Sequence, residues 1–235
     1  MLRVVATPIG NLGDVSERAV RSLREADVLA CEDTRRTRVI FSHFGIKFPS
    51  TVISYREGVE EKAGEKLVRF LQEGKNVVLC SDGGYPGISD PGYRLINKAV
   101  ESGIDIEVIP GASAVPVALL MSGLSAASYT FKGFPPRKEG ALKRFFEEEK
   151  DMCHTLVIFE SPFRVFKTLK AAFEILGDRK AAVCVEMTKK FEKVSRGFLK
   201  DLVSEYDGKK VKGEVTIVVA GNNPKFVKKT SELEG

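Results

Sequence analysis

Residues 79–92 read LCSDGGYPGISDPG, and the run NVVLC at residues 76–80 leads directly into them. A short apolar run of this kind is typical of a strand buried in a parallel sheet. The glycines that follow permit sharp turns and a close approach of a ligand to the main chain, and the prolines fix the turns between them. Open α/β sheets bind ligands in loops at the carboxyl ends of their strands, so the stretch predicts such a site. It lacks the GxGxxG and GK[ST] fingerprints of nucleotide-binding loops, and an ordinary tight connection is the alternative.

Strand-like and helix-like segments alternate on both sides of this loop. Apolar runs indicate strands at residues 2–6, 27–31, 51–54 and 104–109, and helical spacing indicates helices at residues 15–26, 39–44, 59–71 and 93–101. This alternation predicts a parallel sheet covered by helices on both faces.

The second half of the sequence changes character after residues 112–126. We expect strands at residues 129–131, 155–159, 181–187, 193–199 and 213–220, and helices at residues 115–121, 139–150 and 166–176. Two of the later strands lie only a few residues apart, which favours antiparallel pairing. The predicted fold class is therefore α/β with two domains, a mostly parallel sheet in residues 1–115 and a mixed sheet in residues 116–222. Residues 223–235 form a polar tail, and we expect the chain after Gly221 to be loose.

Composition and charge limit the classes of protein that fit. The chain has 235 residues, of which 43% are hydrophobic, enough for a packed core and too many for a disordered chain. No apolar run approaches the ~20 residues that span a bilayer, and the N-terminus does not read as a signal peptide, so we expect a cytoplasmic protein with no membrane partner. The net charge of +5 permits a polyanionic partner. Four cysteines outside any CxxC pair and only two histidines predict no metal site.

Four segments share the pattern of a buried strand followed at once by small or turn-forming residues. They are residues 7–11, 81–92, 110–114 and 160–162. In a parallel sheet such segments gather at the carboxyl ends of the strands, which favours a site for a small ligand.

The densest charged stretch is EDTRRTR at residues 32–38. One interpretation is a solvated helix start, with acids in the first turn and bases further along. The other is an anchor for phosphates, since three arginines within four residues suit bidentate contacts. Arg137 and Lys138 belong to further basic pairs that would extend such a surface. Glu160 is an acid at the end of an apolar strand. Two roles are open for its carboxylate, a structural hydrogen bond and a contact with a ligand.

Several motifs together match a known family. The segments ATPIGNL (6–12), CEDTRRT (31–37), residues 81–92 and PGASA (110–114) are followed by FKGFP (131–135), ESP (160–162), EMTK (186–189) and GE (213–214). Nearly the whole chain thus resembles the ribosomal RNA small subunit methyltransferase I family, a branch of the tetrapyrrole methylase superfamily.

This resemblance implies a fold, a cofactor and a reaction. It implies S-adenosylmethionine as the methyl donor, held in a cleft between two α/β domains, and a homodimer. The implied reaction is 2′-O-methylation of a cytidine ribose in small-subunit (16S) rRNA, with the RNA or the 30S subunit as partner. The cofactor contacts that the resemblance implies are Pro8, Asp82, Gly83, Gly84, Ile88, Ser113, Ala114, Glu160 and Glu214.

The chain also departs from the family pattern. Gly83 and Tyr85 stand where Ala and Thr are usual, Phe163 replaces a His, and Val185 and Phe191 stand where Arg and His are common. Catalytic roles of those histidines or that arginine are therefore not carried over.

A ribose hydroxyl is a weak nucleophile, so a base or a charge near the acceptor should help the transfer. We expect Asp33 or Glu160 to accept or orient the proton, as the catalytic residues. Phosphate contacts are expected from five basic residues, Arg35, Arg36, Arg38, Arg137 and Lys138. The alternatives are a methyltransferase of the same fold acting on a porphyrinoid precursor and a non-catalytic RNA-binding or ribosome-assembly factor.

Overall fold

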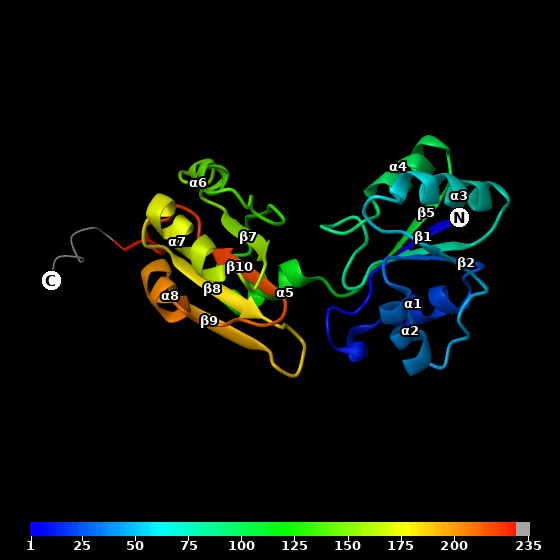
Figure 1. Ribbon diagram of the computed structural model, residues 1–235, viewed down its shortest axis with the longest axis horizontal. Coiled ribbons are helices and arrows are strands. Elements are labelled where there is room, and N and C mark those ends of the chain that lie inside the picture. The colour runs from blue at the N-terminus through cyan, green and yellow to red at the C-terminus, as the bar shows by residue number, and fades with distance from the viewer. Residues whose placement is uncertain (229–235) are drawn as a thin grey trace. The chain divides into compact units, whose positions relative to one another are not determined.

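The computed structural model describes residues 1–228, which form two compact units (Figure 1). Unit 1 comprises residues Met1–Ser113, and unit 2 begins at Ala114. Each unit has its own five-stranded sheet. None of the helices in this described part of the chain is long and apolar enough to cross a membrane.

The sheet of unit 1 is parallel throughout, as the alternation of elements predicted. Its strands, in spatial order, are β3 (Thr51–Ser54), β2 (Val28–Cys31), β4 (Val77–Cys80), β1 (Leu2–Val5) and β5 (Ile106–Ile109). The predicted central strand is β4, and all four of its residues are buried. It lies in the middle of the sheet between β2 and β1, so the loop that follows it opens at the centre of one edge.

Helices cover both faces of this sheet. They are α1 (Glu17–Arg24), α2 (Thr34–His43), α3 (Glu60–Gln72) and α4 (Tyr93–Glu101), with a short 3₁₀ turn at Leu12–Asp14. Leu23 of α1 and Phe41 of α2 pack with Val78 on one face. Leu67 of α3 packs with Leu79 and with α4 on the other face. Figure 1 shows the two helix pairs on opposite sides of the sheet.

The order of the strands creates a topological switch point at the carboxyl end of β4. The chain leaves β1 and β2 toward the face covered by α1 and α2, whereas it leaves β4 toward the face covered by α3 and α4. Because β4 lies between β1 and β2, its loop diverges from the loops on both sides. Such a topological switch point is where open α/β sheets bind ligands.

The sheet of unit 2 is mixed, as predicted. Its order is β6 (Tyr129–Phe131), β7 (Thr155–Glu160), β10 (Val215–Val219), β8 (Lys180–Val185) and β9 (Lys193–Phe198). Strands β6 and β7 are parallel, and the remaining neighbours are antiparallel. The register pairs Val215 with both Glu160 and Val185, so β7 and β8 end at one edge of the sheet. We call this edge, where β6 also ends, the carboxyl edge of unit 2.

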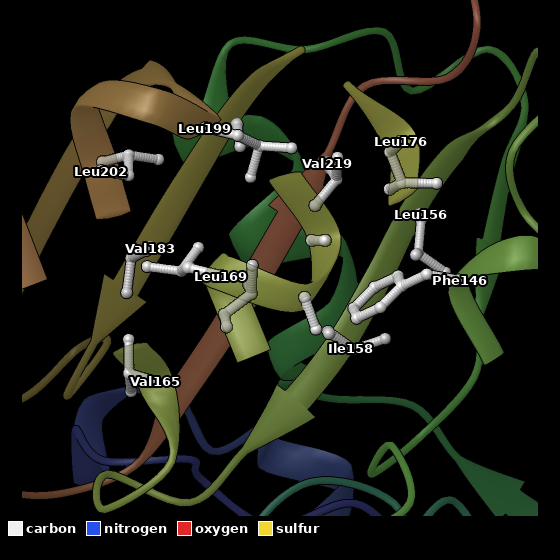
Figure 2. Close-up of a cluster of buried hydrophobic side chains, with 14 of the residues drawn as sticks. Phe146, Leu156, Ile158, Val165, Leu169, Leu176, Val183, Leu199, Leu202 and Val219 are labelled. Atoms are coloured by element: carbon white, nitrogen blue, oxygen red, sulfur yellow. The ribbon is translucent and has the colours of Figure 1, made fainter. Parts of the chain in front are cut away.

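Two layers of helices enclose this second sheet. Leu119 of α5 (Ala114–Ser122) packs on Val157 and Val218 on one face. On the other face lie α6 (Glu139–Glu147), α7 (Val165–Leu176) and α8 (Leu199–Tyr206). Figure 2 shows Leu169 of α7 among the side chains of this larger core, to which Leu202 of α8 also belongs.

Two parts of unit 2 differ from the expectation. Helix α8 follows β9 directly and was not predicted. The chain after Gly221 is not loose as far as residue 228, because it returns to the start of β8. The Lys180 amide donates to the Phe226 carbonyl at 2.8 Å, and the Lys228 amide donates to the Asp178 carbonyl at 3.0 Å. Residues 229–235 of the predicted tail lie outside the described residues.

Candidate active site

The loops after β1 and β4 are joined by backbone hydrogen bonds at the switch point. The Thr7 amide donates to the Gly84 carbonyl and the Gly84 amide donates to the Thr7 carbonyl, both at 2.9 Å. The Thr7 hydroxyl donates to the Ser81 carbonyl at 3.1 Å. Two of the predicted cofactor contacts, Pro8 and Gly83, therefore lie side by side at the end of the sheet.

Backbone segments approach one another closely in these loops. A Cβ at Gly111 would lie 3.1 Å from the Cβ of Ala6, which is a tight contact, whereas a Cβ at Gly83 would lie 3.4 Å from the Pro8 carbonyl oxygen, which is an ordinary one. The Gly111 amide donates to the Tyr85 hydroxyl at 3.0 Å, which ties the loop after β5 to the loop after β4. This hydrogen bond gives Tyr85 a role in holding the two loops together.

A carboxylate, that of Asp82, lies in the loop that follows β4. The Asp33 amide donates to Asp82 Oδ1 at 3.1 Å, and Arg36 Nε lies 3.4 Å from Asp82 Oδ2. These contacts join the loop after β4 to the start of α2. The sequence placed Asp82 in the cofactor site and Asp33 in the catalytic site, and the structure brings the two residues into direct contact.

Asp33 is the N-cap of α2 and is held by Arg35. Its Oδ1 accepts the Arg35 amide at 2.8 Å, and its Oδ2 accepts from Arg35 Nη2 at 2.7 Å. These hydrogen bonds to Arg35 lower the pKa of Asp33 to about 2. Since a carboxylate with so low a pKa is a weak proton acceptor near neutral pH, the geometry favours an orienting role.

Glu32 is a residue of this site that the sequence reasoning did not single out. It follows β2 directly and is partly buried. Burial, together with the negative charges of Asp82 and Asp90, raises the pKa of Glu32. A raised pKa is what a general base requires. Its position immediately after a buried strand was the available signal.

The remaining unit 1 residues of the predicted cofactor site differ in exposure. Pro8 is buried, so its carbonyl rather than its ring borders the loop at Gly83. Ile88 is exposed in the loop after β4 and offers an apolar surface there. Ser113 is the last residue of unit 1 and follows the loop after β5.

Glu160 lies at the carboxyl edge of unit 2, where its carboxylate is buried. The Ser161 amide donates to Oε1 at 2.7 Å, the Thr168 hydroxyl donates to Oε2, and Arg164 Nη1 lies 3.4 Å from Oε1. Arg164 also donates to the carbonyls of Pro135 and Pro136. The structural hydrogen bonding that the sequence left open is therefore present, and both oxygens of Glu160 already have donors.

Glu214 lies at the same edge but in another network. Lys189 Nζ contacts Glu186 Oε1 at 2.8 Å and Glu214 Oε2 at 3.0 Å, so this lysine is neutralised by two carboxylates. Gly213 precedes Glu214 with φ of +90°, and a Cβ there would lie 2.3 Å from side-chain atoms of Glu186. Ala114, the remaining predicted cofactor contact, begins α5.

The five predicted RNA-binding residues are all exposed. Arg35 and Arg36 contact carboxylates at the start of α2, as described above, and Arg38 packs over the Phe48 ring at 4.1 Å from its centroid. Arg137 and Lys138 lie in the loop before α6 and form no ion pair with the described residues. No group of three or more metal-binding side chains occurs among residues 1–228.

The sequence and the fold can be compared with those of known proteins. The family model for tetrapyrrole (corrin/porphyrin) methylases matches residues 1–203. A ribosomal RNA small subunit methyltransferase I from Halalkalibacterium halodurans is 44% identical over 224 residues, which are 95% of this chain and 77% of that protein. The protein of the same name from Thermotoga maritima is 40% identical over 220 residues, 94% of this chain and 98% of that protein.

Solved structures give the same fold at low sequence identity. The methyltransferase CobJ aligns with a TM-score of 0.71 at 16% identity and covers 94% of each chain. Diphthine synthase aligns with a TM-score of 0.70 at 17% identity, covering 99% of this chain and 98% of its own. The fold therefore agrees with the sequence matches. The chain belongs to the tetrapyrrole methylase family and, within it, to the ribosomal RNA small subunit methyltransferase I group.

Proposed function

We propose that this protein transfers the methyl group of S-adenosylmethionine to the 2′-hydroxyl of a cytidine ribose in small-subunit rRNA. The names of the relatives at 40–44% identity support a methyltransferase acting on this RNA. The observation that carries the proposal is the switch point at the end of β4, where the Asp33 amide donates to Asp82. The resemblance adds a homodimer that acts on rRNA or on the 30S subunit, and we propose a cytoplasmic location on the sequence pattern alone.

The residues in the loops at the end of β4 fit the chemistry of the donor. S-adenosylmethionine carries a positively charged sulfonium and an adenine ring, and it supplies an electrophilic methyl group. Asp82 offers a partly exposed carboxylate, and Ile88 offers an exposed apolar side chain for the ring. Gly83 lies beside the Pro8 carbonyl at the end of the sheet. Gly84, Ser113, Ala114, Glu160 and Glu214 complete the proposed cofactor set.

Positioning of the ribose hydroxyl would supply much of the rate, because a well-oriented acceptor reacts as if at very high concentration. Asp33 is hydrogen-bonded to both Asp82 and Arg35, and it would orient the site by keeping these two side chains in place. Glu32, with its raised pKa, is the better candidate to accept the hydroxyl proton. Glu160 would act by fixing the start of α7 rather than by taking a proton.

The test is transfer of a labelled methyl group to small ribosomal subunits that lack the modification, followed by nucleoside analysis. Labelled 2′-O-methylcytidine is the expected product. Label in a porphyrinoid precursor and none in RNA would replace the proposal with the tetrapyrrole reaction. Donor binding without transfer to either substrate would indicate a non-catalytic factor.

A second experiment separates the cofactor site from the overall fold. Calorimetry with S-adenosylmethionine should show weaker binding for Asp82→Asn than for the parent protein. The matched control is Asp105→Asn, which lies before β5 at the opposite end of the same sheet. Equal affinity of both variants for the donor would rule out Asp82 as a cofactor residue.

A further inference from the structure

Three phenylalanine side chains stand in solvent at the carboxyl edge of unit 2. Phe134 follows β6, Phe163 follows β7, and Phe191 lies in the turn between β8 and β9. Their exposed fractions are 60%, 93% and 74%, respectively. We call this set the aromatic edge. Large apolar rings are expensive to leave in water, so three at one edge of one sheet indicate a surface that contacts a partner.

The three rings follow strands that are spread across the sheet of unit 2. Phe134 and Phe163 follow adjacent parallel strands, and the Phe159 amide donates to the Gly133 carbonyl at 2.9 Å. Phe134 also lies edge-on to Phe159, with ring centroids 5.7 Å apart. Strand β8, which leads to Phe191, is two strands from β7, or about 10 Å at the usual strand spacing. The strands that lead to the three rings therefore span four neighbouring positions of the sheet, from β6 to β8.

Cationic side chains accompany the rings. Arg137 and Lys138 follow Phe134, and Lys190 precedes Phe191 with its Nζ 5.6 Å from the ring centroid. None of these three cations forms an ion pair with a residue in the described part of the chain. The aromatic edge thus combines exposed rings with cations that form no ion pair in the described part of the chain.

We propose that the aromatic edge stacks unpaired bases of a single-stranded RNA segment while Arg137, Lys138 and Lys190 contact its phosphates. This inference rests on the proposed function and extends it to a binding mode. Charge complementarity favours RNA, because its phosphates would pair with the three cations, whereas the same edge of a second copy would bring like charges together. Aromatic rings interleaved with basic side chains are the usual means of binding single-stranded nucleic acid, where each ring stacks on one base.

Leucine substitutions separate stacking from general apolar contact. In fluorescence anisotropy with a labelled single-stranded oligoribonucleotide, Phe163→Leu and Phe191→Leu should each bind at least about fivefold more weakly than the parent protein. Each substitution retains an apolar side chain but removes the aromatic ring. The control is Tyr129→Leu, an exposed aromatic at the start of β6, on the opposite edge of the same sheet. Its affinity for the RNA should not change.

A fluorescence reporter gives a second, independent readout. The chain contains no tryptophan, so Phe163→Trp introduces a single indole. Addition of the unlabelled oligoribonucleotide should quench the indole emission if a base stacks on it, whereas Tyr129→Trp should not be quenched. This readout depends on local contact, so it remains decisive even if a leucine variant is poorly folded.

The outcomes distinguish this inference from the proposed function. Equal RNA affinity of the leucine and control variants, or no RNA binding by the parent protein, overturns the inference that the aromatic edge binds RNA. So does a shift of the leucine variants to a smaller oligomer with RNA binding retained, because the rings would then pack against a second copy. Stacking without methyl transfer to rRNA would overturn the proposed function alone. Methyl transfer with an unchanged KM in all ring variants would overturn the inference alone.

Discussion

At the scale of single residues, Gly92 shows how closely the loop after β4 folds on itself. A Cβ at this position would lie 2.6 Å from the Gly87 amide nitrogen, which is a backbone clash that no side-chain movement relieves. We expect Gly92→Ala to lower the free energy of unfolding by about 1–3 kcal/mol and to weaken donor binding. Urea denaturation and calorimetry measure the two effects.

The control for this substitution is Gly64→Ala in α3. There the new Cβ meets only a side-chain carbon of Lys98 at 3.8 Å, an ordinary contact. Alanine also has the higher helix propensity, so the variant should gain about 0.5–1 kcal/mol. If both variants unfolded at the same urea concentration, the proposed clash at Gly92 would be wrong.

A second residue-scale prediction concerns Glu205 and acid stability. Burial alone would raise its pKa, but hydrogen bonds from Lys209 and Ser195 outweigh burial and lower the pKa to about 2, from an ordinary value of 4.5. A carboxyl group with a lowered pKa stabilises the fold above its ordinary pKa, and this contribution is lost as the pH falls toward 2. Glu205→Gln should therefore flatten the pH dependence of unfolding between pH 4.5 and 2.

Thermal unfolding followed at several pH values between 2 and 7 measures this slope. The reference variant is Glu57→Gln, an exposed glutamate without an ion pair in the described part of the chain. The assignment would fail if the two variants lost stability in parallel as the pH was lowered.

At the scale of elements, the junction of β7 and α7 depends on one buried carboxylate. The Thr168 hydroxyl of α7 donates to Glu160 at the end of β7, so the contact links strand to helix. Thr168→Val keeps the shape of the side chain and removes the donor. We expect a loss of about 1.5–3 kcal/mol in the free energy of unfolding, the usual worth of a hydrogen bond to a charged group.

The matched control is Thr216→Val, a buried threonine of β10 in the same sheet. Its hydroxyl makes no hydrogen bond with another described residue, so little change is expected. Denaturant titration of the two variants gives the comparison. A loss at Thr168 no larger than that at Thr216 would show that the Glu160 contact does not hold the junction together.

The same elements show what the sequence could and could not reveal. Strand β4 was predictable because a run of four buried apolar residues at 77–80 ends at a Gly-rich loop. Helix α8 was missed because it starts directly at the end of β9, so no turn residue separates the helix from the strand. The return of residues 222–228 to β8 was also missed, since backbone hydrogen bonds of a polar segment leave no pattern in the side chains.

At the scale of the whole molecule, the strand order was the part that local patterns could not supply. The alternation of elements predicted a parallel sheet, but the place of β4 between β2 and β1 depends on pairings between distant residues. That order decides which loops meet, and so brings the Asp33 amide to Asp82. The aromatic edge was hidden for a related reason: phenylalanines can be counted in a sequence, but their exposure follows only from packing.

The basic side chains of both units lead to a prediction about salt. Arg35 and Arg38 lie on α2 in unit 1, and Arg137 and Lys138 precede α6 in unit 2. Each phosphate contact with single-stranded RNA releases counterions and adds about 0.7 to the slope of log K against log salt concentration. If both pairs bind phosphates, replacing either pair with glutamine should reduce that slope by about 1.4.

Anisotropy titrations of an oligoribonucleotide at several salt concentrations measure the slopes, with Lys75→Gln and Lys150→Gln together as the charge-matched control. The control carries the same net charge as either double variant but alters residues that precede β4 and β7, at the ends of the two sheets opposite the proposed sites. A slope that falls only for the unit 2 pair would confine RNA binding to that unit. A slope that falls equally in the control would mean that net charge, rather than a defined surface, attracts the RNA, and would overturn the assignment of all four residues.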